Sequence, residues 1–192
     1  MSIVPDTGIV RAYYQIACEA NIEHKPSAFW QVWLQRVIAS EPYLYSIACD
    51  SSPDESLRRV DGVVKRYDPS HHRTLSAMLW VECESPRGSA RDAENQALDA
   101  AIRCIQADNL LWIYAMTTVG VTFRAWFMEK RGNKLFPLHG TEVTGDRSQY
   151  IDADSEDASI LRDCIELVKD QKPLGHAPVL SKSELASRPS RV

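Results

Sequence analysis

The feature that most constrains the fold is a nearly continuous apolar stretch in the second half of the chain, LLWIYAMTT at residues 110–118, followed by VTFRAWFME at residues 121–129. A strand with one wet face alternates apolar and polar residues, so a strand without that alternation is typically buried on both faces. Val119 and Gly120 separate the two runs, which therefore form either a hairpin or two consecutive strands. The first run is predicted to be a central strand.

Two further runs have β character, LRRVDGVVKRYD at residues 57–68 and RTLSAMLWVEC at residues 73–83. The turn-rich residues DPSHH lie between them, which predicts two antiparallel strands of a hairpin. A short strand is expected at Lys134–Leu138, followed by a long polar loop over residues 139–154. These strands would form one mixed sheet.

Apolar residues with helical spacing predict four helices that cover this sheet. The order of the elements then indicates an α/β or α+β fold, with a mixed central sheet flanked by helices. Residues 1–171 are expected to form a single globular domain, and residues 172–192 a loosely ordered or disordered tail. The helices are predicted over residues 8–20 after Asp6 or Thr7 as cap, over 27–38 from Ser27, over 89–106 from Ser89, and from Ser155 through Val168.

The bulk composition narrows the functional classes. A formal net charge of -4 in 192 residues gives no global basic field, which counts against a protein that coats nucleic acid, although a local basic patch is compatible with it. Five cysteines without a CxxC pair suggest neither a disulfide framework nor a zinc site. No signal peptide or membrane span is expected, and the predicted location is cytoplasmic or nuclear. A homodimer is an expectation from general frequency alone.

Each strand of the predicted hairpin carries a lone acid, Asp61 on the first and Glu82 on the second. A buried carboxylate without a partner costs several kcal/mol, roughly, so two of them on adjoining strands need an explanation. Hard divalent cations prefer oxygen ligands of this kind. If the register aligns the two acids, they are candidate ligands for Mg²⁺ or Mn²⁺, and the alternative is a turn contact for Asp61 with an arginine partner for Glu82.

The motifs VDG at residues 60–62 and VECE at residues 81–84, followed by a helix that carries Gln96, resemble the PD-(D/E)xK nuclease superfamily. The resemblance implies a restriction-endonuclease-like core and metal-dependent hydrolysis of phosphodiesters in nucleic acid. It implies that Asp61 and Glu82 bind the metal and that Gln96 orients a ligand or substrate. The segments IYAMTTVGVTFRAW and GDRSQYIDADS also resemble proteins of filamentous fungi, a likeness that implies no activity.

The sequence departs from that family where the family has lysine, because Glu84 occupies the position. Residues 82 and 84 share one face of a strand, so a third acid would replace the cation that helps to activate water. Lys65, on the same face of the preceding strand as Asp61, is the candidate for a migrated catalytic lysine, and Arg91 is another substitute. The first helix could add a further acid, Glu19 or Glu23.

A second functional class is therefore open: reuse of the scaffold without nuclease activity. The five tryptophans and several tyrosines could line an apolar pocket for a small-molecule, biosynthetic enzyme, although core packing explains them as well. A protein-binding module is a further alternative. His71 and His72 fit an exposed turn better than a metal site, and the loop that begins at His139 is a candidate active-site lid.

Overall fold

The structure of the chain is a computed structural model, described over residues 1–19, 24–38, 43–54, 57–68 and 74–170. The predicted tail at residues 172–192 lies outside the described residues, as do Glu23, His71 and His72. The strands are β1 (Tyr45–Ser51), β2 (Val60–Asp68), β3 (Thr74–Glu84), β4 (Trp112–Val119), β5 (Thr122–Glu129), β6 (Phe136–Pro137) and β7 (Ile151–Asp152). The helices are α1 (Ile9–Glu19), α2 (His24–Ile38), α3 (Ala90–Ala107) and α4 (Ser159–Asp170), with short 3₁₀ turns η1 (Arg147–Gln149) and η2 (Glu156–Ala158).

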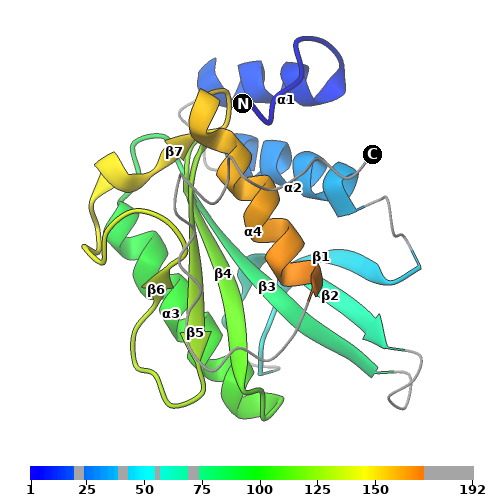
Figure 1. Ribbon diagram of the computed structural model, residues 1–192, viewed down its shortest axis with the longest axis vertical. Coiled ribbons are helices and arrows are strands. Elements are labelled where there is room, and N and C mark those ends of the chain that lie inside the picture. Colours follow the sequence, from blue (N-terminus) through cyan, green and yellow to red (C-terminus); the bar gives the residue numbers. More distant parts are fainter. Residues whose placement is uncertain (20–23, 39–42, 55–56, 69–73, 171–192) are drawn as a thin grey trace.

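One mixed sheet organises these elements (Figure 1). Strands β1 to β6 lie side by side in chain order, and β7 pairs with β5 beyond that path. Strands β3 and β4 run parallel, with α3 as the connection between them, and every other pair is antiparallel. Helices cover both faces: α1, α2 and α4 pack on one side and α3 on the other. The predicted mixed α/β architecture is confirmed.

The apolar segment at residues 110–129 is the β4–β5 hairpin, with β4 in the interior of the sheet. All residues of β4 from Ile113 to Val119 are buried, as expected of a strand covered on both faces. Gly120 turns the chain with φ +61°, a conformation that strains other residues. A Cβ there would also come within 3.2 Å of Pro86 Cα, so both backbone and space favour glycine.

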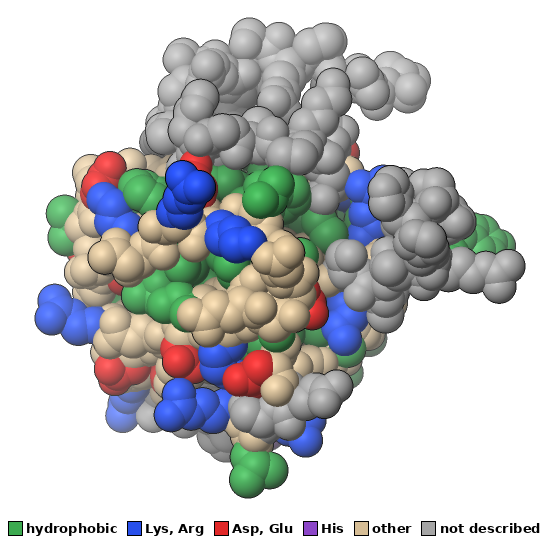
Figure 2. All heavy atoms as spheres, turned by 90° about the horizontal axis from the view of Figure 1, so that it is seen from below, with side chains coloured by type: hydrophobic (Ala, Val, Ile, Leu, Met, Phe, Trp, Pro, Cys, Tyr) green, Lys and Arg blue, Asp and Glu red, His purple; other side chains and the backbone are tan. Residues whose placement is uncertain are grey.

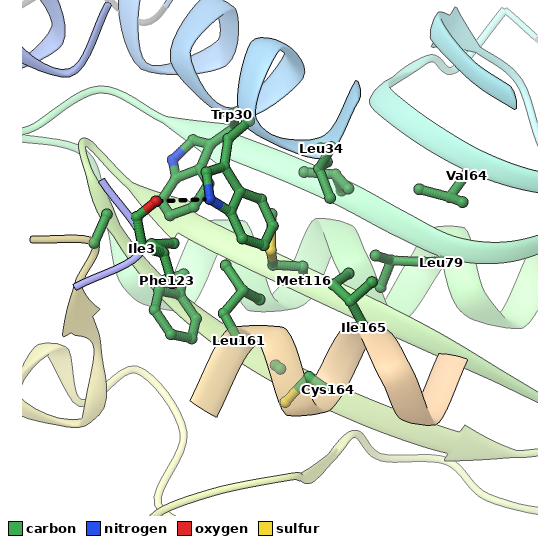
Figure 3. Close-up of a cluster of buried hydrophobic side chains, with 14 of the residues drawn as sticks. Ile3, Trp30, Leu34, Val64, Leu79, Met116, Phe123, Leu161, Cys164 and Ile165 are labelled. Carbon is green, nitrogen blue, oxygen red and sulfur yellow. Dashed lines mark hydrogen bonds between the residues drawn. The ribbon is translucent and has the colours of Figure 1, made fainter. Parts of the chain in front are cut away.

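The two helical layers pack differently because their residues differ in size. Helix α3 presents small residues to the sheet, among them Ala93, Ala97 and Ala101, all without exposed surface. The other layer is aromatic: Trp30 of α2 packs edge-on against Phe123 of β5, with ring centroids 5.9 Å apart (Figure 3). The Trp30 Nε1–H donates to the Gly120 carbonyl at 2.9 Å. Small side chains allow α3 to pack close to the strands, whereas large side chains separate α2 from the sheet.

Several elements differ from the sequence-based expectation. Helix α2 begins at His24, three residues before Ser27, because Pro26 is tolerated in the first turn of a helix. The edge strand β1 was not predicted, since its residues YSIACDS alternate weakly and run into a turn-rich segment. Ser89 caps α3 as predicted, accepting from the Asp92 backbone N–H at 3.2 Å, whereas the Ser155 side chain makes no capping bond.

Candidate functional site

The β2–β3 ladder opens into a fork at Asp61 and Glu82. The last pair in the ladder is Gly62 with Val81, which puts Asp61 and Glu82 at the next position. Asp61 Oδ2 accepts a hydrogen bond from the Cys83 backbone N–H at 2.7 Å, so a side chain occupies the place that a backbone carbonyl of β2 would take in a continued ladder. The register that the sequence left open therefore puts the two acids at facing positions of β2 and β3.

Glu82 is buried, with 4% of its surface exposed. Burial, and after it the charge of Asp61, raise the pKa of its carboxyl group to about 8. Arg103 and a hydrogen bond from the Asp61 backbone N–H act in the opposite direction, and the charge of Glu84 adds a small increase in the pKa. Arg103 itself donates to Asp99 at 2.9 Å and to Asp54 at 3.0 Å. The fork is thus a site where negative charge is unfavourable without a cation.

The structure sets the other predicted site residues apart from the fork. Lys65 is four residues from Asp61, about 13 Å along a strand. Burial raises the pKa of Cys104 on α3, and the charge of Lys65 is one of the smaller effects that oppose this rise. Gln96 is on the solvent-exposed side of α3. The catalytic roles predicted for Lys65 and Gln96 therefore gain no support from their positions.

The remaining residues considered for the site, Arg91, Glu84 and Glu19, contact other parts of the chain or solvent. The Arg91 side chain lies against the turn at Gly145, because a Cβ added there would come within 2.9 Å of its Nε. Glu84 lies over Gly88 in the turn before α3, where an added Cβ would meet Oε2 at 2.6 Å. Glu19 is exposed at the end of α1. The fork is formed by two acids, without a lysine at the position that the resemblance requires.

A pocket of about 420 Å³ adjoins the fork, between α2 and strands β1 to β3. Asp61, Gly62 and Cys83 form the wall that it shares with the fork. Its volume is within the range of roughly 300–1,000 Å³ typical of small-molecule sites. The remaining lining residues are His24, Ser27, Ala28, Trp30, Gln31, Leu34, Ile47, Cys49, Asp50, Val63, Val64 and Val81. One tryptophan, Trp30, lines this pocket, in place of the several aromatic residues expected from the sequence. Most other aromatic residues pack in the core.

A buried arginine on β5 forms a second polar cluster, on the α3 side of the sheet. Arg124 has no exposed surface, and its guanidinium donates to the Val143 carbonyl at 2.7 Å and to the Thr141 carbonyl. It also contacts Glu94 at 3.4 Å and lies over the Trp126 ring at 4.1 Å. Arg124 therefore ties the segment after β6 to the sheet.

Glu94 is the counter-charge of this cluster and gathers further donors. Its carboxylate accepts from the Tyr150 hydroxyl at 3.2 Å and from the Gly145 backbone N–H at 2.5 Å. The Tyr150 hydroxyl also makes a 2.8 Å hydrogen bond with Thr117 on β4. This cluster was not among the predicted sites, although the single arginine within the apolar run VTFRAWFME was a signal that could have revealed it.

The loop predicted as an active-site lid is held by the same cluster. His139 at its start is buried, and its Nε2 accepts from the Ala125 backbone N–H at 3.3 Å. Burial and the charge of Arg124 lower its pKa to about 4, so the imidazole is neutral near pH 7. At the far end, Asp154 pairs with Arg11 of α1. These contacts describe an anchored segment, and the acceptor nitrogen of His139 is already engaged with the Ala125 N–H.

The donor set at the fork fits a hard divalent cation. Two carboxyl groups that repel one another are the oxygen ligands that Mg²⁺ uses, with water and substrate oxygens at the other positions. Within the part of the chain that the structure describes, no group of three or more histidine, cysteine, aspartate or glutamate side chains could hold a metal ion. The fork would therefore supply two protein ligands and no more from these residue types.

Among residues 1–170 with the gaps stated above, no helix has both the length and the apolar character needed to cross a bilayer. In the comparisons with known proteins, no family model, no curated protein and no solved structure matches the chain.

Proposed function

We propose that the chain is a divalent-cation-dependent phosphodiesterase related to the PD-(D/E)xK nucleases, with Asp61 and Glu82 as its metal ligands. The observation that carries the proposal is the position of these two acids at facing places beyond the last pair of the β2–β3 ladder, where the charge of Asp61 raises the pKa of Glu82. The order of two antiparallel strands, a helix and a strand parallel to the second of them also agrees with the family that the motifs resemble.

The residues of the fork have distinct tasks in this proposal. The Cys83 N–H orients the Asp61 carboxylate, and the Asp61 N–H stabilises the charged form of Glu82. A bound Mg²⁺ or Mn²⁺ would polarise the phosphodiester and supply a water of lowered pKa. Because Glu84 replaces the lysine of the family, we expect slow turnover.

Metal binding provides the direct test. We expect Asp61→Asn and Glu82→Gln each to weaken Mn²⁺ binding about 10–100-fold in calorimetric titrations, because each loses a charged ligand. The matched control is Glu84→Gln, which removes one negative charge from the same strand but no proposed ligand, and a change of roughly twofold is expected. Equal effects of all three variants would show that general electrostatics, and not a site at the fork, attract the cation.

A cleavage assay tests the activity separately. Wild-type protein with Mn²⁺ should hydrolyse an activated phosphodiester, bis(4-nitrophenyl) phosphate, and Asp61→Asn should abolish that release of nitrophenol. If the wild type binds the metal but does not hydrolyse this substrate, a cation site remains and the proposal of phosphodiesterase activity is wrong.

The pocket beside Asp61 favours a second candidate, a small-molecule enzyme built on the same scaffold. Its apolar floor and its volume are suited to an apolar small molecule, which differs from the charged backbone of a nucleic-acid strand. Ligand binding that is unchanged by Asp61→Asn and independent of metal would support this candidate over the first.

A further inference from the structure

We infer that the site accepts a small phosphodiester with one neutral apolar group in the pocket under α2, and not a nucleic-acid strand. This inference rests on the proposed function of the fork. The pocket and the fork share Asp61, so a phosphoryl group held near that carboxylate through a cation could place one of its two ester groups in the pocket.

The floor of the pocket provides the surface for such a group. Trp30 and Leu34 of α2 face Val64 and Val81 of the sheet, and all four are buried. Figure 3 shows Trp30 and Leu34 between α2 and the sheet, and Val64 on a strand of the same cluster. A ring-sized apolar group there would exchange water contact for aliphatic and aromatic contact, which is favourable at about 25 cal/mol per Å² of apolar surface.

The charges of the lining argue against a strand of nucleic acid. Asp50 and Asp61 contribute carboxylates, and none of the fifteen lining residues is lysine or arginine. A nucleic-acid strand carries a phosphate on every nucleotide and is bound through lysine and arginine contacts to those phosphates. Figure 2 shows acidic and basic side chains interspersed on the face that it presents, without a single-sign stripe on that face. A second phosphate in the pocket would therefore be repelled.

The two thiols of the lining add no charge that would alter this conclusion. Burial, and after it the nearby charge of Asp61, raise the pKa of the Cys83 thiol to about 12. The pKa of Cys49 is likewise raised, by burial and by Asp50 and Asp61. Both groups are neutral at pH 7 and behave as small apolar side chains.

The reaction would be a simple hydrolysis. Water adds to phosphorus, the P–O bond to one alcohol breaks, and the departing alkoxide takes up a proton. The products are a phosphomonoester and an alcohol, and no reactant other than water is consumed.

The test compares the binding of two ligands and uses tryptophan substitutions on two walls of the pocket to fill it. We expect diphenyl phosphate to bind the wild type in the presence of Mg²⁺ more tightly than a single-stranded oligothymidylate, by calorimetry. Ala28→Trp on α2 and Ile47→Trp on β1 should each weaken the binding of diphenyl phosphate about tenfold or more, since an indole would occupy the pocket. Gln35→Trp is the matched control, because Gln35 is exposed on α2 and does not line the pocket.

The outcomes separate this inference from the proposed function. Tighter binding of the oligonucleotide, or normal binding of diphenyl phosphate by both pocket-filled variants in folded form, would overturn the inference while the metal titration could still succeed. If Asp61→Asn retained wild-type Mn²⁺ affinity, the proposed function would fail, whatever the pocket binds. Circular dichroism of each variant establishes that it is folded, and agreement of the two independent tryptophan variants excludes a local packing defect as the cause.

Discussion

The fork and the Arg124 cluster each hold a glutamate with 4% of its surface exposed, yet their surroundings are opposite. Glu94 faces a guanidinium, a tyrosine hydroxyl and a backbone N–H, all of which are donors. Glu82 faces the like charge of Asp61, and burial and that charge raise its pKa to about 8 despite the opposing effects of Arg103 and the Asp61 N–H. A buried acid that is surrounded by donors stabilises a structure, whereas one placed beside another acid is maintained against its electrostatic cost, which is typical of functional sites.

The largest effect on stability should come from removing the guanidinium group of Arg124. Arg124→Leu would leave Glu94 buried beside two released carbonyl groups, so we expect the free energy of unfolding to fall by about 3–5 kcal/mol. Urea unfolding measures this loss. The double variant Arg124→Leu/Glu94→Leu should recover part of it, because no unpaired charge is then buried. A loss below about 1 kcal/mol for Arg124→Leu would remove the distinction between the two glutamates.

Removing the charge of Glu82 should stabilise the folded chain in metal-free buffer, in contrast to the loss expected for Arg124→Leu. Its pKa is raised from 4.5 to about 8 in the folded chain, so the unfolded chain binds fewer protons between these values and stability falls as pH rises. Glu82→Gln abolishes this term. The stability of Glu82→Gln relative to the wild type should therefore increase from about pH 4.5 to about pH 8, by at most about 1.4 kcal/mol per pH unit. Urea titrations across that range measure the difference, and a flat profile would contradict the burial of Glu82 beside the charge of Asp61.

His139 tests the anchored loop through a narrower pH range. Its pKa is lowered from 6.5 to about 4, so the unfolded chain binds the additional proton and stability is lost as pH falls from 6.5 towards 4. His139→Gln retains an acceptor for the Ala125 N–H but does not titrate. Its stability should depend less on pH than that of the wild type in this range, as measured by the urea midpoint. Identical pH profiles would mean that His139 is not held in a dry site.

Gly145, whose N–H donates to Glu94, should give the smallest effect. Its φ of +72° disfavours alanine by about 1–2 kcal/mol, and a Cβ would press on the Arg91 side chain at 2.9 Å. Gly8→Ala is the control, since Gly8 also has positive φ but open space around the added carbon. Thermal unfolding should show a greater loss for Gly145→Ala. Equal losses would indicate backbone strain alone and no crowding at the Glu94 cluster.

The facing positions of the two acids were predictable to the extent that the hairpin was. The sequence singled out Asp61 and Glu82 from their positions in two β-like runs, and the strand register puts them at facing positions. Lys65 was selected from the same two-residue period, but period alone carries no information on distance along the strand. Asp50 and the α2 wall of the pocket could not be identified, because β1 lacks a clear alternation and the partner of α2 is far away in sequence.

The sequence by itself determined the layers of this protein. An apolar strand that cannot face water requires cover on both sides, and the periodic helices supply it, because hydrophobic burial depends on local pattern. Tertiary structure alone decided which acid is compensated. Glu82 and Glu94 are both acids in half-apolar segments, and electrostatic free energy depends on which charges lie within a few ångströms in space. That proximity arises from residues as distant in the chain as Arg124 and Glu94, or Asp61 and Cys83.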